Sequence, residues 1–183
     1  MTSRLFISFD IPEDILQKII SVRNELYPDK KVSWEGRNKL HITAKFLGDT
    51  DENLIPEIEN RIEKVISDFP EIKSEFNRFG IFYKNDKPKI LWLGMKENET
   101  LQKLYACIEK EMYKLGFEKE KRKFKPHLTI LRVRGREDIS KIIYMSKTEI
   151  DSIVFYIEQV SLIKSELQQS GSVYTILKSF KLS

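Results

Sequence analysis

The chain has 183 residues, a mass of 21.7 kDa and a net charge of +4, and 40% of its residues are hydrophobic. This composition is typical of a folded globular protein, and the length suits one substantial domain or two small lobes that share a core. No apolar run reaches the roughly 18 residues of a membrane-spanning helix, which excludes a helical membrane protein.

Strands and helices are predicted to alternate along the first half of the chain. The segment 4–11 alternates apolar and polar residues, which indicates a first strand rather than a secretion signal. Pro12 then opens a helix whose first turn carries two acids, as the helix dipole favours. The apolar spacing further predicts a short strand at 31–34, a longer strand at 39–48 and a helix at 51–69.

The second half continues this alternation. Predicted elements are strands at 71–82 and 89–95 around a turn at 83–88, a helix from Thr100 to Leu115, a strand at 127–133, a helix at 137–147, and closing strands at 152–167 and 172–182 joined by a turn at 168–171. No linker interrupts the series, so we expect residues 1–183 to form one compact unit. A faint likeness between the halves suggests two similar lobes that face each other.

Cys107 is the single cysteine and lies inside a helical pattern. One thiol can build neither a disulfide framework nor a cysteine zinc site. We therefore expect Cys107 to serve packing only, and the chain to work in the reducing cytoplasm as a monomer, since nothing in it indicates an obligate partner.

Positive charge is concentrated in the segment 118–136, which holds eight Lys or Arg residues and two Glu residues. A solvated charged turn is the usual meaning of such a run. This run surrounds His127, however, which favours a phosphate or polyanion ligand.

Both histidines of the chain occur in the pattern His-x-Thr, in "HITA" at His41 and in "HLTI" at His127. In a strand, residues two apart project from the same face. His41 and Thr43 should therefore share one face, and Ile42, Ala44 and Phe46 the other. One such motif is weak evidence, but two that use every histidine are strong evidence of a shared site.

Two imidazoles and two hydroxyls across a groove suit metal-free phosphate ester chemistry. One neutral imidazole can accept a proton from a nucleophile, and the other, protonated, can donate one to the leaving oxygen. The hydroxyls can bind the phosphate oxygens. A metal site, a serine hydrolase and an ATP site are disfavoured, because their ligand sets, nucleophile elbow and glycine-rich loop do not occur.

At these residues the sequence resembles the 2H phosphoesterase superfamily, and within it the RNA 2′,3′-cyclic phosphodiesterases, historically called 2′-5′ RNA ligases. The resemblance extends over the whole chain, from "RLFISFDIP" through "LHITAKFLG", "KILWLG" and "FKPHLTILR" to "VSLIKSELQQSGSVYTILKSFKL". It implies an α+β, bilobal fold with two antiparallel sheets facing a central groove and helices on the outside.

The resemblance also implies the roles of the residues. His41 would be the acid and His127 the base in hydrolysis of an RNA 2′,3′-cyclic phosphate end to a 2′-phosphate, with no cofactor and no metal. Thr43 and Thr129 would bind the phosphate. The pattern itself leaves the division between acid and base open.

Five further residues are weaker candidates. Arg132 matches the basic residue that follows the second motif in the family, but alternation places it opposite His127 unless a bulge intervenes. Lys45 shares the parity of His41 and can bind phosphate or be solvated. Trp34, Phe79 and Trp92 can stack a base or fill the core.

Two other functions use the same features. The site can join an RNA 5′-hydroxyl to the cyclic phosphate, for example on tRNA halves, although water competes strongly as nucleophile. A non-catalytic RNA-binding module would use only the basic segment and would bind in a salt-sensitive manner.

Overall fold

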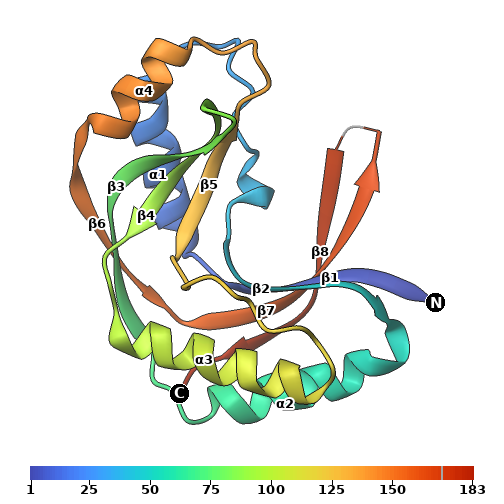
Figure 1. The fold of residues 1–183 in the computed structure, drawn as a ribbon. Helices are drawn as coiled ribbons and strands as arrows, with labels where there is room; N and C mark the ends of the chain where they lie inside the picture. The colour runs from blue at the N-terminus through green and yellow to red at the C-terminus, as the bar shows by residue number, and fades with distance from the viewer. Residues whose placement is uncertain (170) are drawn as a thin grey trace.

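The computed structural model describes residues 1–169 and 171–183, and its elements follow the predicted alternation (Figure 1). The helices are α1 (Glu13–Leu26), α2 (Ile55–Ile66), α3 (Glu99–Lys114) and α4 (Ile139–Lys147), with the 3-10 turns η1 (Arg37–Lys39) and η2 (Glu52–Leu54). The strands are β1 (Thr2–Phe9), β2 (Ile42–Asp51), β3 (Ile72–Lys84), β4 (Lys87–Met95), β5 (His127–Arg132), β6 (Glu149–Ile157), β7 (Gln159–Gln168) and β8 (Gly171–Lys181). Among these helices, none has the length and apolar character needed to cross a membrane.

The strands form one 8-stranded sheet in the order β6-β3-β4-β5-β2-β1-β7-β8, and every pairing is antiparallel. The central strands β5 and β2 pair at a single position, where Ile42 lies opposite Leu128. Figure 1 shows the two halves diverging from this seam. The α+β class and the antiparallel strands are confirmed, and the two predicted sheets are halves of one sheet.

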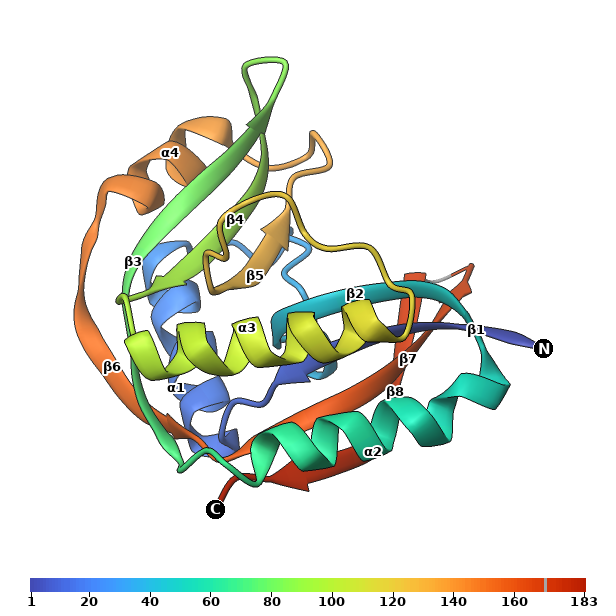
Figure 2. The same cartoon turned by 60° about the horizontal axis from the view of Figure 1, so that its bottom comes forward.

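The helices pack outside the sheet, as predicted. α2 and α3 lie side by side, with α2 against β8 and α3 against β2 (Figure 2). α4 packs on β3 and β4 in the other half. The helices bury apolar stripes at helical spacing, such as Ile58, Ile62 and Val65 in α2.

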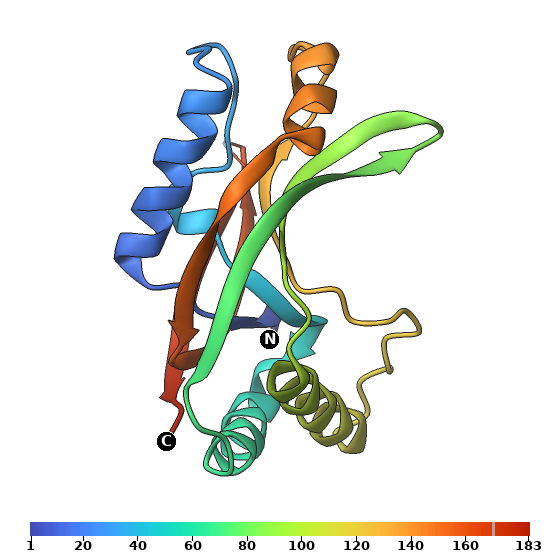
Figure 3. The same cartoon turned by 90° about the vertical axis from the view of Figure 1, so that its left-hand side faces the viewer.

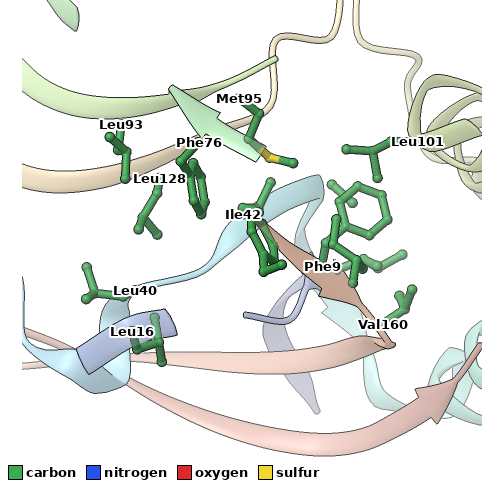
Figure 4. Close-up of a cluster of buried hydrophobic side chains, with 14 of the residues drawn as sticks. Phe9, Leu16, Leu40, Ile42, Phe76, Leu93, Met95, Leu101, Leu128 and Val160 are labelled. Atoms are coloured by element: carbon green, nitrogen blue, oxygen red, sulfur yellow. The ribbon is translucent and has the colours of Figure 1, made fainter. Parts of the chain in front are cut away.

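The hydrophobic core crosses the seam between the halves. Figure 4 shows Ile42 and Leu128 in one cluster with Phe9 of β1, Phe76 of β3 and Leu101 of α3. All five side chains are 0% exposed. Because the two halves share this core, the position of one half relative to the other is set by close packing. Cys107 of α3 is partly buried against the same core, in keeping with a packing role.

The turn predicted at 83–88 is confirmed as the tip of the long β3–β4 hairpin (Figure 3). Asn85 and Asp86 adopt φ values of 50° and 57°. Two consecutive positive φ values characterise the type I′ turn, which matches the twist of paired strands and favours Asn and Asp.

Two predicted strands are wrong in part. Residues 31–34 form no strand, because local backbone hydrogen bonds such as Trp34 N–H to the Val32 carbonyl hold this segment instead. The predicted strand 152–167 is two strands that meet at Glu158, since β6 pairs with β3 and β7 pairs with β1 and β8. The chain passes there from one half of the sheet to the other. Ser170, in the predicted turn 168–171, lies outside the described residues.

Candidate active site

The pairing of β2 with β5 brings the two His-x-Thr motifs together. The paired residues, Ile42 and Leu128, are the middle residues of the two motifs and are fully buried. The flanking His41, Thr43, His127 and Thr129 are all partly exposed, so they project from the opposite face of the sheet. We call this face the motif face. The prediction that the two motif strands lie side by side is confirmed.

The register also determines how the motifs face each other. In an antiparallel pair centred on Ile42 and Leu128, the imidazole of each motif lies across from the hydroxyl of the other. Burial is the main cause that lowers the pKa of His41, and the positive charges of Arg132 and of a protonated His127 lower it further, so these groups lie within electrostatic reach of one another. An anion bound between the strands would meet two imidazoles and two hydroxyls.

The His127 ring is held in a defined orientation. Its Nδ1 lies 2.8 Å from the carbonyl oxygen of Lys125, and because a carbonyl only accepts, Nδ1 carries the proton. Nε2 of the neutral ring is therefore left with its lone pair. Burial lowers the pKa of His127, and the Arg132 charge lowers it further against the hydrogen bond to Lys125.

The pKa of His41 is perturbed more strongly than that of His127. The backbone of Lys39, which again lies two residues before the histidine, acts to raise its pKa. Burial lowers the pKa of His41 to about 4, although the Lys39 backbone opposes the shift. Both imidazoles are therefore neutral at pH 7 in the free protein.

Each histidine lies against two aromatic rings. The ring centroid of His41 is 4.8 Å from that of Phe6 and 5.3 Å from that of Tyr174. The centroid of His127 is 5.0 Å from Phe82 and 6.2 Å from Trp92. These rings explain the loss of hydration that lowers both pKa values. Phe6, Tyr174 and Phe82 were not predicted, because their strands lie far from the motifs in sequence.

Arg132 lies on the motif face because β5 contains the bulge that its prediction required. Leu131 pairs with Leu91 and Thr129 with Trp92, so Ile130 is the additional residue. The bulge inverts the alternation, so that Ile130 and Leu131 are both fully buried and Arg132 is exposed. Its Nε lies 3.4 Å from Oε1 of Glu35, a residue that sequence reasoning missed.

The predicted contact of Lys45 with phosphate is wrong. A bulge at Ala44 in β2, seen where Thr43 pairs with Ser8 and Lys45 with Ile7, turns Lys45 toward the helices. Its Nζ donates to Glu109 Oε1 at 2.7 Å and to the Glu118 carbonyl at 2.8 Å, and the residue is 5% exposed. Phe46, predicted to enter the core, is correspondingly 73% exposed.

Of the three candidate stacking residues, only Trp92 lies on the motif face. Phe79 is buried in the core, and Trp34 packs against the core beneath the Arg23 guanidinium. Trp92 and His127 both line a pocket of about 180 Å³ between β4, α3 and the loop that precedes β5. Within residues 1–169 and 171–183, no three His, Cys, Asp or Glu side chains gather as a set of metal ligands.

The chain is similar to proteins of one family. Residues 11–169 match the model of the 2′-5′ RNA ligase superfamily. The chain is 32% identical over 180 residues to an RNA 2′,3′-cyclic phosphodiesterase of Methanocaldococcus jannaschii, covering 97% of this chain and 99% of the relative. A Bacillus subtilis protein of the same name is 30% identical and covers 97% of this chain and 96% of its own.

The fold is also shared with a solved structure. The crystal structure of E. coli LigT in its apo form superposes with a TM-score of 0.81, at 22% identity, over 100% of this chain and 99% of that chain. Together with the family match, which spans most of the residues and includes both His-x-Thr motifs, this similarity places the chain in the 2′-5′ RNA ligase superfamily.

Proposed function

We propose that this protein hydrolyses the 2′,3′-cyclic phosphate at the 3′ end of RNA and leaves a 2′-phosphate. The observation that carries the proposal is the pairing of Ile42 with Leu128, which places both His-x-Thr motifs on one face. The names of the relatives, RNA 2′,3′-cyclic phosphodiesterase, support the same reaction. The two sheet halves act as pseudo-symmetric lobes of one domain, and each supplies one motif.

His127 is the base in this proposal. Its Nε2 accepts a proton from water while the water oxygen attacks phosphorus, and the Lys125 carbonyl stabilises the imidazolium that forms at Nδ1–H. The bond from phosphorus to the 3′ oxygen breaks as the new bond forms. Thr43 and Thr129 donate hydrogen bonds to the non-bridging oxygens, where negative charge develops.

His41 is the acid and protonates the departing 3′ oxygen. With a pKa of about 4 in the free protein, it is neutral at pH 7. A bound phosphodiester brings a negative charge that offsets the positive charge of Arg132 and favours the imidazolium, so His41 takes up a proton as substrate binds. After one turnover His127 is protonated and His41 neutral, and proton exchange with solvent restores both.

The direct test is turnover of an RNA oligomer that ends in a 2′,3′-cyclic phosphate, with the position of the product phosphate determined. We expect a 2′-phosphate, formed at the same rate in EDTA. An added oligomer with a 5′-hydroxyl should remain largely unjoined, because water at about 55 M competes for the same phosphorus. A dominant 2′-5′ joined product would favour ligation, and RNA retained without turnover would favour a binding module.

A further inference from the structure

The indole of Trp92 lies flat on the motif face across two glycines. A Cβ added to Gly80, which pairs with Trp92 across the β3–β4 hairpin, would lie 2.2 Å from the indole ring. A Cβ on Gly94, two residues along β4, would lie 2.5 Å from the ring. Real Cβ atoms do not approach this closely, so both positions must lack a side chain for the ring to lie where it does.

Packing alone fixes the position of the Trp92 ring. Trp92 Nε1 is buried and has no hydrogen-bond partner in the described residues, so no polar contact orients the indole. Phe82 lies beside the ring, with a centroid distance of 5.3 Å and an interplanar angle of 36°, and Trp92 is a partly exposed residue. A large ring laid flat beside a histidine and left partly uncovered offers a surface for another flat ring.

The volume of the pocket beside this ring suits a nucleobase, and the charge of its wall suits a phosphate. Its volume of about 180 Å³ is below the roughly 300 to 1,000 Å³ typical of drug-sized ligands, which suits a single base. Phe82 and Phe124 line it together with Trp92, while Arg78, Lys123 and Lys125 supply positive charge at the wall. Lys123 is paired with Glu97 at 3.2 Å, but both side chains are largely exposed and the pair is weak.

The pocket lies next to the place where the phosphate would react. His127 itself is part of the lining, and Lys125, whose carbonyl holds the His127 ring, contributes its side chain to the same pocket. A base on Trp92 would lie beside His127, at the distance of a neighbouring ring, and so close to the phosphorus that His127 addresses. The cations would contact the next phosphate of that strand.

We propose that this pocket is a nucleobase subsite in which Trp92, seated on Gly80 and Gly94, stacks the base of the nucleoside bonded to the reacting phosphorus. The inference rests on the proposed function and adds a specificity element to it. Two strands can supply that base: the one that ends in the cyclic phosphate, or one whose 5′-hydroxyl attacks it. Stacking on an aromatic ring accepts every base, so the subsite selects nucleotides over simple cyclic phosphates without strong sequence preference.

Three variants test the ring and its seat separately. Trp92→Leu removes the stacking surface, Trp92→Phe keeps a smaller ring, and Gly80→Ala keeps the indole but forces it from its position. Trp34→Phe is the matched control, because it alters the other tryptophan, which lies outside the pocket. Each variant is assayed on adenosine 2′,3′-cyclic phosphate, on abasic ribose 2′,3′-cyclic phosphate, and on a cyclic-phosphate oligomer with and without an added 5′-hydroxyl oligomer.

We expect Trp92→Leu and Gly80→Ala to lower kcat/KM for adenosine 2′,3′-cyclic phosphate by roughly 5- to 100-fold, the value of one stacked base. Trp92→Phe should recover part of this loss, and kcat/KM for the abasic substrate should stay unchanged. This pattern supports the subsite and assigns the base to the cyclic-phosphate strand. A loss confined to joining of the 5′-hydroxyl oligomer supports the subsite and assigns the base to the attacking strand.

Equal losses on the base-bearing and abasic substrates, or no loss on either, would overturn the subsite while leaving the proposed hydrolysis intact. If the wild type turns over no substrate at all, the proposed function fails, and the subsite is then judged by binding. In the Trp34→Phe background Trp92 is the single tryptophan, and its fluorescence should be quenched by an oligomer that ends in a 2′-phosphate. Unchanged fluorescence at saturation would overturn the subsite as well.

Discussion

The two halves of the motif face use the same backbone device to present different chemistry. In each half a histidine is influenced by the backbone two residues before it, lies against two aromatic rings, and precedes a threonine that is followed by a bulge. After the bulge the halves differ. Arg132 projects onto the motif face in the β5 half, whereas the corresponding residue of the β2 half is Phe46.

Because of this difference, a phosphate bound between the two halves would meet different surroundings on its two sides. The β5 half brings a cation, a nearby pocket and a histidine whose Nε2 lone pair is left free. The β2 half brings apolar rings and the histidine with the lower pKa. A near-symmetric backbone can therefore support asymmetric proton transfer, because only the side chains after each bulge and around each ring need to differ.

The largest expected effect comes from removing either histidine. His41→Ala and His127→Ala should each lower kcat on a cyclic-phosphate oligomer by roughly 10²- to 10⁴-fold, since each removes one proton transfer. Far-ultraviolet circular dichroism should show an unchanged fold. If one variant keeps near-normal turnover, the two motifs do not act on the same phosphorus.

The residue just after each bulge provides the second test. Leu131 is buried in one half, and its counterpart Lys45 is buried with Glu109 in the other. Glu109→Leu alone leaves the Lys45 ammonium buried without its partner, and we expect the free energy of unfolding to fall by about 3–5 kcal/mol. Lys45→Leu combined with Glu109→Leu, which copies the apolar half, should recover most of this loss.

Denaturant unfolding measures these changes, with the exposed pair of Lys178 and Glu63 as control. Lys178→Met should change stability by less than about 1 kcal/mol, because both partners are substantially exposed. The double variant could instead be no more stable than Glu109→Leu. That outcome would mean that the hydrogen bond from Lys45 to the Glu118 carbonyl, at the start of the basic segment 118–136, stabilises the fold more than the ion pair does.

The third test replaces Arg132 and its counterpart Phe46, which are the second residues after the bulge in each half. Arg132→Met should lower kcat/KM about 100-fold, the usual cost of removing one group that stabilises transition-state charge. Phe46→Met, at the counterpart position, should keep kcat/KM within about twofold of the wild-type value, because the apolar ring that it removes stabilises no charge in the transition state. Equal effects would show that Arg132 is a surface charge.

Spacing in the sequence was sufficient to predict the motifs, but it did not reveal the bulges. His41, Thr43, His127 and Thr129 follow from local alternation, which needs no knowledge of the partner strand. Lys45 and Phe46 were assigned to the wrong faces, because a bulge depends on register with β1 and leaves no local signature. Arg132 was assigned correctly only on the condition of a bulge.

Long-range pairing accounts for the other failures. Gly80 and Gly94 are visible in the sequence, but their relation to Trp92 appears only once β3 pairs with β4 in register. The division of 152–167 at Glu158 is hidden for the same reason, because alternation continues while the chain changes halves. Local pattern thus predicts element type and motif chemistry, whereas the surroundings of the site depend on contacts between distant strands.

The fourth test is the pH dependence of catalysis. Turnover requires one protonated and one neutral imidazole, and in the free enzyme the pKa values of both rings lie below the usual 6.5. The maximum of kcat/KM should therefore lie below pH 6.5, and kcat/KM should fall toward higher pH. The maximum of kcat should lie at higher pH, because bound phosphate raises the pKa of His41. Coincident maxima would mean that substrate leaves His41 unperturbed.

The fifth test concerns stability and the burial that distinguishes His41. In the unfolded chain His41 binds a proton with the ordinary pKa of 6.5, but in the folded protein only at about 4. Between these values unfolding takes up a proton, so the free energy of unfolding decreases as pH falls through this window.

His41→Asn should remove about 3 kcal/mol of this dependence, measured by denaturant unfolding at several pH values. The matched variant His127→Asn should remove less, because its ring is less buried. Parallel curves for the wild type and His41→Asn would mean that the His41 ring is as well hydrated in the folded protein as in the unfolded chain.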